Sequence, residues 1–176
     1  MNILVCISKA PDTTSKIAFS EGNTKFDENG VQFIVNPYDE WYALVRALEL
    51  KETGGGQVTI ITVGGATDDA VIRKALAIGA DNAVRIDTEP KDAYSAAMQI
   101  ASYAKENSFD LILTGKETIN YNGSQLGGML AEGLDLPFVS LATKLDVAGT
   151  TLTVEREIIG GVQVVEVQAP AVISCA

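Results

Sequence analysis

The stretch FDLILTGKETINYNGSQLGGMLAEGLDLP, residues 109–137, contains one complete strand, loop and helix unit. Residues 109–114 are an apolar run typical of a buried strand, and residues 123–133 follow a helical pattern. The loop between them consists of small and amide residues. Small residues let a ligand approach the backbone, and free N–H groups at a helix start suit an anion, most often a phosphate.

The same alternation of buried strand and helix occurs before this stretch. Apolar runs predict strands, and amphipathic patterns between them predict helices. The strands are expected at residues 2–8, 57–63 and 83–87, and the helices at residues 38–52, 68–78 and 91–107. This order predicts an α/β fold of three layers, a parallel sheet with helices on both faces.

Residues 9–35 interrupt the alternation and are expected to form a loop and a hairpin. The hairpin would join the runs TKF and VQFIV through the turn signal Glu28-Asn29-Gly30. Asn36 and Pro37 then resemble a helix cap followed by proline at the first helical position, with Asp39 and Glu40 in the first turn.

After Pro137 the pattern changes to short strands separated by glycine turns. Residues 141–147, 151–158 and 162–168 predict an antiparallel C-terminal β-hairpin arrangement that extends the sheet or reaches towards a partner. Residues 170–176, PAVISCA, are apolar to the last one, so we expect either that the chain continues or that another subunit covers this end. Residues 1–176 are expected to form a single domain.

Composition excludes several classes of function. A net charge of −10 with 13 basic residues and no basic cluster argues against nucleic acid or anionic lipid as a partner. No stretch is long and apolar enough to cross a membrane, and no signal segment precedes the first strand, so we expect a cytoplasmic protein. The absence of histidine removes the commonest general base and most catalytic metal sites, so binding or carrying is favoured over bond-changing chemistry, and we expect no catalytic residue and no metal.

Two small-residue loops follow predicted strands, at residues 64–67 and 115–127. In the second, Ser124, Gln125 and the backbone of Leu126 and Gly127 would hold a phosphate in the first helical turn. A plain helix start capped by Asn122 or Ser124 fits the spacing equally well. The loop is not a P-loop, because Glu117 follows Gly115-Lys116 where Ser or Thr is required.

Several segments, in order along nearly the whole chain, resemble the small (beta) subunit of electron transfer flavoproteins. They are ILVCISKAPDT, NPYDE, IRKALAIGAD, the strand, loop and helix unit above, and LTVEREIIGG. The resemblance implies a fold of the adenine-nucleotide alpha-hydrolase type and a heterodimer. In such a heterodimer an alpha subunit holds the redox-active FAD and the beta subunit holds a structural AMP.

The resemblance also implies a place in electron transport. Electrons pass from acyl-CoA dehydrogenases of fatty acid oxidation to the FAD, and then to a quinone oxidoreductase, while the beta subunit changes no bond. Carried over by position, Arg156 and Glu157 lie near the partner and its flavin. The nucleotide site falls on Cys6, Asn36, Pro37, Tyr38, Asp39, Val63, Gly115, Lys116, Glu117, Thr118, Ile119, Asn120, Tyr121, Asn122, Gly123, Ser124, Gln125 and Leu126.

This sequence departs from the family pattern in ways that keep alternatives open. Asn120 and Asn122 replace a common Asp, and Leu126 replaces a common Thr, so one hydroxyl contact to phosphate is lost. In flavin-bifurcating relatives a second FAD takes the place of AMP. The C-terminal arm that wraps the alpha subunit is expected to be absent here. A stand-alone ATP- or AMP-binding sensor resembling universal stress proteins is the alternative of a different class.

Overall fold

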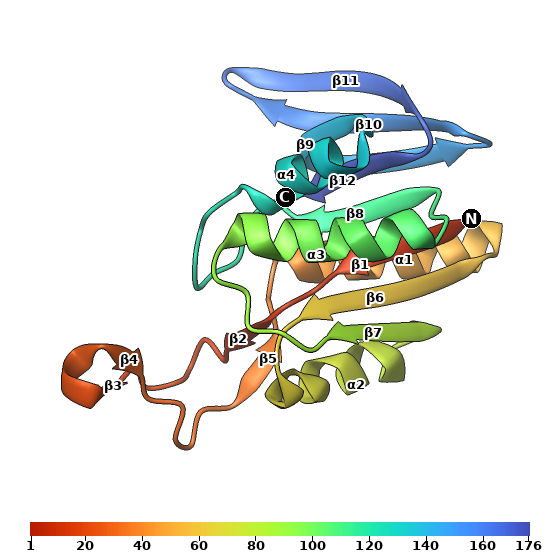
Figure 1. The fold of residues 1–176 in the computed structure, drawn as a ribbon. Helices are drawn as coiled ribbons and strands as arrows, with labels where there is room; N and C mark the ends of the chain where they lie inside the picture. Colours follow the sequence, from red (N-terminus) through yellow and green to blue (C-terminus); the bar gives the residue numbers. More distant parts are fainter.

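An eight-stranded sheet forms the centre of the protein, and helices cover both of its faces (Figure 1). The computed structural model describes residues 1–176 without a gap. The strand order is β11-β10-β9-β12-β8-β1-β6-β7. The strands are β1 (Asn2–Cys6), β6 (Gln57–Val63), β7 (Asn82–Ile86), β8 (Leu111–Gly115), β9 (Phe138–Ala148), β10 (Thr151–Ile158), β11 (Gly161–Gln168) and β12 (Ala171–Cys175).

Most neighbouring strands of this sheet are parallel. Strand β1 lies between β6 and β8, parallel to both. Its side chains alternate between two core clusters: Ile3 and Val5 belong to one, and Leu4 and Cys6 to the other. A strand covered on both faces reads as a continuous apolar run, which is the pattern that predicted a central strand here.

Two helices lie on each face of the sheet. Helices α1 (Asp39–Gly54) and α2 (Asp69–Ala77) contribute to one core cluster. Helices α3 (Ala93–Glu106) and α4 (Leu126–Leu134) contribute to the other. The structure therefore confirms the predicted α/β fold with a mostly parallel sheet between helical layers.

The C-terminal strands differ from the prediction in one respect. Strands β9, β10 and β11 are antiparallel neighbours, as their turn residues indicated. The final apolar run, however, forms β12, which lies between β9 and β8 and is parallel to both. All its residues are buried inside the sheet. The apolar character of this run is therefore explained by burial within its own sheet, and the expectation that the chain continues or that another subunit covers this end stays a prediction.

The segment between β1 and α1 pairs differently from the predicted hairpin. Strand β2 (Lys9–Pro11) pairs with β5 (Phe33–Val35), and β3 (Phe19–Ser20) pairs with β4 (Lys25–Phe26). The short 3-10 helix η1 (Glu21–Asn23) joins β3 and β4. Its residues all have positive φ angles, which reverse the chain before the predicted turn at residues 28–30 is reached. The β3–β4 segment extends away from the sheet (Figure 1).

Two helices start later than their sequence patterns indicated. Helix α1 begins at Asp39, after Tyr38 with φ 67° and ψ −107°, and no side chain caps it. The predicted cap at Asn36 was therefore wrong. Helix α4 begins at Leu126 instead of Gly123, because Asn122 and Ser124 have φ angles of 48° and 50°, outside the helical region. No helix combines the length and apolar character needed to span a bilayer.

Candidate functional site

A cavity of about 410 Å³ lies at the carboxyl edge of the parallel sheet. It is lined by the last residues of three neighbouring strands: Cys6 of β1, Val63 of β6 and Gly115 of β8. Ala96 and Ile100 of α3 form part of its wall, so the cavity lies on the α3 and α4 face. Ligands of open parallel sheets bind at this edge.

The structure brings most of the predicted site residues to this cavity. Those that line it are Cys6, Val63, Gly115, Lys116, Glu117, Thr118, Asn120, Tyr121, Gly123, Ser124, Gln125 and Leu126. A second hollow, of about 250 Å³, lies beside it and shares Lys116 and Glu117. The predicted residues Pro37, Tyr38, Asp39, Ile119 and Asn122 line this second hollow instead.

Asn36 lines neither hollow, and it holds the loop that separates them. Its side chain is fully buried. Its Oδ1 accepts a hydrogen bond from the Ile119 N–H at 3.2 Å, and its Nδ2 donates to Asn120 Oδ1 at 3.3 Å. Nδ2 also donates to Ser8 Oγ at 3.4 Å. Asn36 thus connects the loop of residues 116–125 to the end of β1 by hydrogen bonds. A helix cap would instead bond to the first turn of its own helix.

The start of α1 is pressed against the end of β8. Asp39 Oδ2 accepts a hydrogen bond from the Glu117 N–H at 3.2 Å and lies 3.8 Å from Lys116 Nζ. A Cβ atom on Gly115 would lie 2.8 Å from Glu40 Cγ. Only glycine permits this approach, so Gly115 fixes where the loop leaves the sheet.

Glu40 is a cavity-lining residue that the sequence reasoning missed as a site residue. Its carboxylate accepts hydrogen bonds from the Ser8 N–H at 2.7 Å and the Ser8 hydroxyl at 3.0 Å. Burial raises the pKa of Glu40 to about 8, against the lowering effect of the two Ser8 hydrogen bonds. The adjacent Asp39 raises the same pKa further. The sequence feature that could have identified Glu40 as a site residue is its position directly after Asn36-Pro37-Tyr38-Asp39.

The start of α4 is not blocked by its own side chains. Gln125 occupies the N-cap position and makes no side-chain cap. Ser124 lies before the helix, not in its first turn as predicted, and its hydroxyl donates to Glu117 Oε2 at 3.0 Å. The N–H groups of Leu126, Gly127 and Gly128 have no acceptor within the helix. The predicted alternative, a start capped by Asn122 or Ser124, is therefore not what the chain forms.

These features suit an anionic group at the start of α4. The helix offers unpaired backbone donors and the positive end of its dipole. Thr114, the residue before Gly115, adds a buried hydroxyl that has no hydrogen-bond partner in the protein. An orphaned donor beside uncapped backbone N–H groups fits a ligand that supplies several acceptor oxygens.

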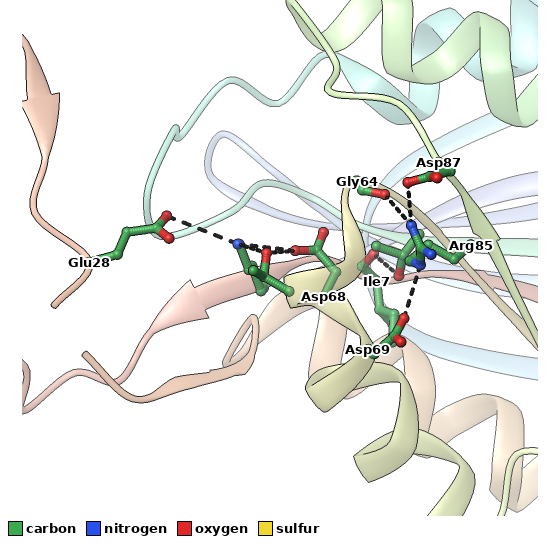
Figure 2. A network of polar contacts seen from close by, with 10 residues as sticks. Ile7, Glu28, Gly64, Asp68, Asp69, Arg85 and Asp87 are labelled. Atoms are coloured by element: carbon green, nitrogen blue, oxygen red, sulfur yellow. Dashed lines mark hydrogen bonds and ion pairs between the residues drawn. The ribbon is translucent and has the colours of Figure 1, made fainter. Parts of the chain in front are cut away.

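The opposite wall of the cavity was not assigned from the sequence. It includes Lys9, Gly64, Asp68, residues 89–92 before α3, and Ala93, the first residue of α3. Lys9 Nζ lies 3.1 Å from Asp68 Oδ1 and donates to Thr67 Oγ1 at 2.7 Å. Lys9 Nζ also lies 4.0 Å from Glu28 Oε1. Figure 2 shows Arg85 bridging Asp69, Asp87 and the Gly64 carbonyl. The small-residue loop at residues 64–67 was the signal for this wall.

Comparison with known proteins places the chain in a family. Residues 23–176 match the electron transfer flavoprotein domain. The chain belongs to the electron transfer flavoprotein family. The chain is 38% identical to electron transfer flavoprotein subunit beta of Bacillus subtilis over 178 residues, which cover 99% of this chain and 68% of that protein.

Two further relatives are an electron transfer flavoprotein subunit beta and a protein FixA. The subunit beta of Syntrophomonas wolfei is 37% identical, with 99% of this chain and 69% of that protein covered. Protein FixA of Azotobacter vinelandii is 35% identical, with 99% of this chain and 65% of that protein covered. This electron transfer flavoprotein chain thus spans about two thirds of the length of these relatives. The matches confirm the resemblance to the beta subunit.

Arg156 and Glu157, predicted near the partner, lie apart from the cavity of this electron transfer flavoprotein chain. Both are on β10, and three strands of the sheet, β9, β12 and β8, separate β10 from β1. Arg156 Nη2 donates to Ser140 Oγ at 2.9 Å, while its Nε is buried without a partner. Glu157 is exposed. Their role towards a partner stays a prediction.

Proposed function

We propose that this chain is the beta subunit of an electron transfer flavoprotein and that it binds AMP as a structural nucleotide. The cavity at the carboxyl ends of β1, β6 and β8 is the proposed site. The position of this cavity supports an assignment to the α/β folds of the adenine-nucleotide alpha-hydrolase type. Its volume lies within the range of about 300–1,000 Å³ that is common for small-molecule sites.

The observation that carries the proposal is the uncapped start of α4 at the cavity. The backbone donors of its first turn would hold the phosphate, and Gln125 stands beside them at the N-cap position. Cys6 and Val63 would bound the less polar part of the nucleotide, because they line the cavity from the adjacent strand ends. The hydrogen bonds that Asn36 and Asp39 accept from the backbone N–H groups of Ile119 and Glu117 would keep the 116–125 loop in place around it.

The redox step belongs to the partner in this proposal. An alpha subunit holds FAD, and that FAD takes electrons from acyl-CoA dehydrogenases and passes them to a quinone oxidoreductase. The beta chain changes no bond, and its residues bind and orient. Arg156 and Glu157 on β10 would face the alpha subunit, away from the nucleotide cavity.

The test is the nucleotide content of the chain co-expressed with an alpha subunit. The heterodimer is denatured, and the released nucleotides are separated and quantified. Equal amounts of AMP and FAD are expected. No AMP in a heterodimer that contains FAD would contradict the proposal.

A second FAD in place of AMP is the alternative that one observation favours. The cavity continues from the 116–125 loop past Asp68 to residues 89–93, beyond the part assigned to AMP. Two FAD per heterodimer would select this alternative. ATP on an isolated homodimer would instead indicate the stand-alone sensor.

A further inference from the structure

Thr114 has a buried hydroxyl for which the fold provides no partner. Its side chain is 1% exposed, and its Oγ1 makes no hydrogen bond to any protein atom. Buried polar groups in native proteins are nearly always paired, so each exception requires an explanation. Thr114 is in β8 and points to the same face as Ile112, which packs with α3 and α4.

A second buried threonine shows what an internally satisfied hydroxyl looks like in this sheet. Thr62, in β6, is also 1% exposed. Its Oγ1 donates to the Ile7 carbonyl at 2.9 Å, so its role is structural. Thr114 has the same burial without such a bond. The two residues therefore form a matched pair that differs in hydrogen bonding.

The unpaired hydroxyl lies where the cavity meets α4. Thr114 is among the residues that line the cavity. Its Oγ1 lies 2.9 Å from the position that a Cβ atom on Gly127 would occupy, and Gly127 is the second residue of α4. Two independent features thus meet at one corner: a helix start without a side-chain cap and a hydroxyl without a partner.

The ligand group that satisfies both features is an anion with several acceptor oxygens. The backbone N–H groups of the first turn are donors, and a threonine hydroxyl can rotate to donate as well. Glu117, the nearby carboxylate, is turned towards Ser124 and Lys116 and makes no bond to Thr114. A phosphoryl group offers the required oxygens at the positive end of the helix dipole.

We propose that Thr114 is a further binding residue of the cavity, whose hydroxyl donates a hydrogen bond to the phosphoryl group of the nucleotide at the start of α4. This inference rests on the proposed nucleotide-binding function. It assigns to Thr114, the next-to-last residue of β8, a contact that the loop and the helix do not supply.

The test compares T114V, T114S and T62V with the wild-type chain by calorimetric titration with AMP and with adenosine. T114V should bind AMP about tenfold more weakly, as expected for loss of a hydrogen bond to a charged group. Its affinity for adenosine, which has no phosphoryl group, should not change. T114S should keep AMP binding within about twofold, because it keeps the hydroxyl.

Thermal unfolding of the ligand-free proteins separates binding from stability. T114V should unfold at the same or a higher temperature than wild type, because it removes an unpaired buried hydroxyl. T62V should unfold at a lower temperature with unchanged AMP affinity, because its hydroxyl serves the fold. If T114V does not fold, T114A takes its place in both measurements.

The outcomes distinguish the two proposals. Equal AMP affinity of T114V and wild type would overturn the role of Thr114 and leave the proposed function standing. If T114V weakens the binding of AMP and of adenosine equally, the role of Thr114 towards the phosphoryl group is likewise overturned, and the proposed function stands. A wild-type heterodimer that contains FAD and binds neither compound would overturn the proposed function, and the role of Thr114 with it.

Discussion

Glu117 places a negative charge beside the proposed phosphate position. Its Oε2 accepts the Ser124 hydroxyl at 3.0 Å, and its Oε1 lies 3.6 Å from Lys116 Nζ. A bound phosphate would meet this charge, and it would find the Ser124 hydroxyl already occupied. Glu117 therefore limits how tightly an anion can bind, although Lys116 and the start of α4 favour it.

The change E117Q should strengthen AMP binding. Removing one like charge a few ångströms from a dianion in partly solvated surroundings is expected to improve affinity roughly two- to fivefold. The measurement is the dissociation constant of AMP by calorimetry. E52Q is the control, because Glu52 is exposed near the C-terminal end of α1, away from the cavity. Weaker AMP binding by E117Q would show that the carboxylate itself contacts the ligand.

Glu40 makes the stability of the ligand-free protein depend on pH. Burial raises its pKa in the folded protein from 4.5 to about 8. Between these values the folded chain holds a proton on Glu40 that the unfolded chain has released. The free energy of unfolding therefore falls as pH rises through this window, and it levels off above pH 8. No histidine titrates in the same range, because the chain contains none.

The change E40Q should remove this fall. A glutamine keeps the shape and can still accept the Ser8 N–H, but it never acquires a charge. Relative to wild type, E40Q should gain on the order of 4 kcal/mol in unfolding free energy between pH 5 and pH 8, at about 1.4 kcal/mol per pH unit. Urea denaturation at several pH values within that window measures this, with E52Q as the exposed control. Parallel pH profiles of E40Q and wild type would refute the assignment.

At the scale of elements, α4 approaches the sheet through one of its two adjacent glycines. A Cβ atom on Gly127 would lie 2.9 Å from both the Phe138 ring and Thr114 Oγ1. A Cβ atom on Gly128 would be 3.5 Å from the same ring, which is ordinary contact. The helix start can therefore lie over the end of β8 only if residue 127 has no side chain.

G127A should destabilise the protein, and G128A should not. G127A is expected to destabilise the protein by about 1–3 kcal/mol, because the ring or the helix must move. G128A should be neutral or stabilising by up to about 1 kcal/mol, since alanine is the better helix former. Chemical denaturation of both variants measures the difference. Equal effects would mean that α4 does not pack as closely as this geometry requires.

At the scale of the whole molecule, repeated local patterns predicted the fold class. The position of the last strand and the contacts of Asn36 depend instead on long-range pairing. The apolar run of β1 and the glycine-bounded loops predicted a parallel sheet with a site at its carboxyl edge. A central strand and an edge strand covered by a partner both have an apolar sequence like that of β12. The insertion of β12 beside β8 was therefore not predictable from the sequence. Asn36 suits a helix cap or a loop clamp equally well by residue type, and only the fold brings it to Ile119.

The charge of the whole chain opposes the ligand proposed for it. The net charge is −10. Two lysines that line the cavity form ion pairs with carboxylates: Lys9 pairs with Asp68, and Lys116 pairs with Asp39 and Glu117. Binding of a phosphate then depends on backbone donors whose effect is short-ranged, while the repulsion from the remaining acidic residues is long-ranged. Salt screens the long-range part first.

AMP should therefore bind more tightly when salt is added, which is the opposite of a site built from free lysines. Raising NaCl from about 20 to about 200 mM shortens the screening length to below 10 Å and should strengthen AMP binding roughly twofold. Adenosine, which is neutral, serves as the control and should show no such gain. The change E117Q should reduce the salt dependence, because it removes one repelling charge beside the proposed phosphate position. If AMP binding weakens with salt instead, the lysines around the cavity, not the start of α4, supply most of the attraction.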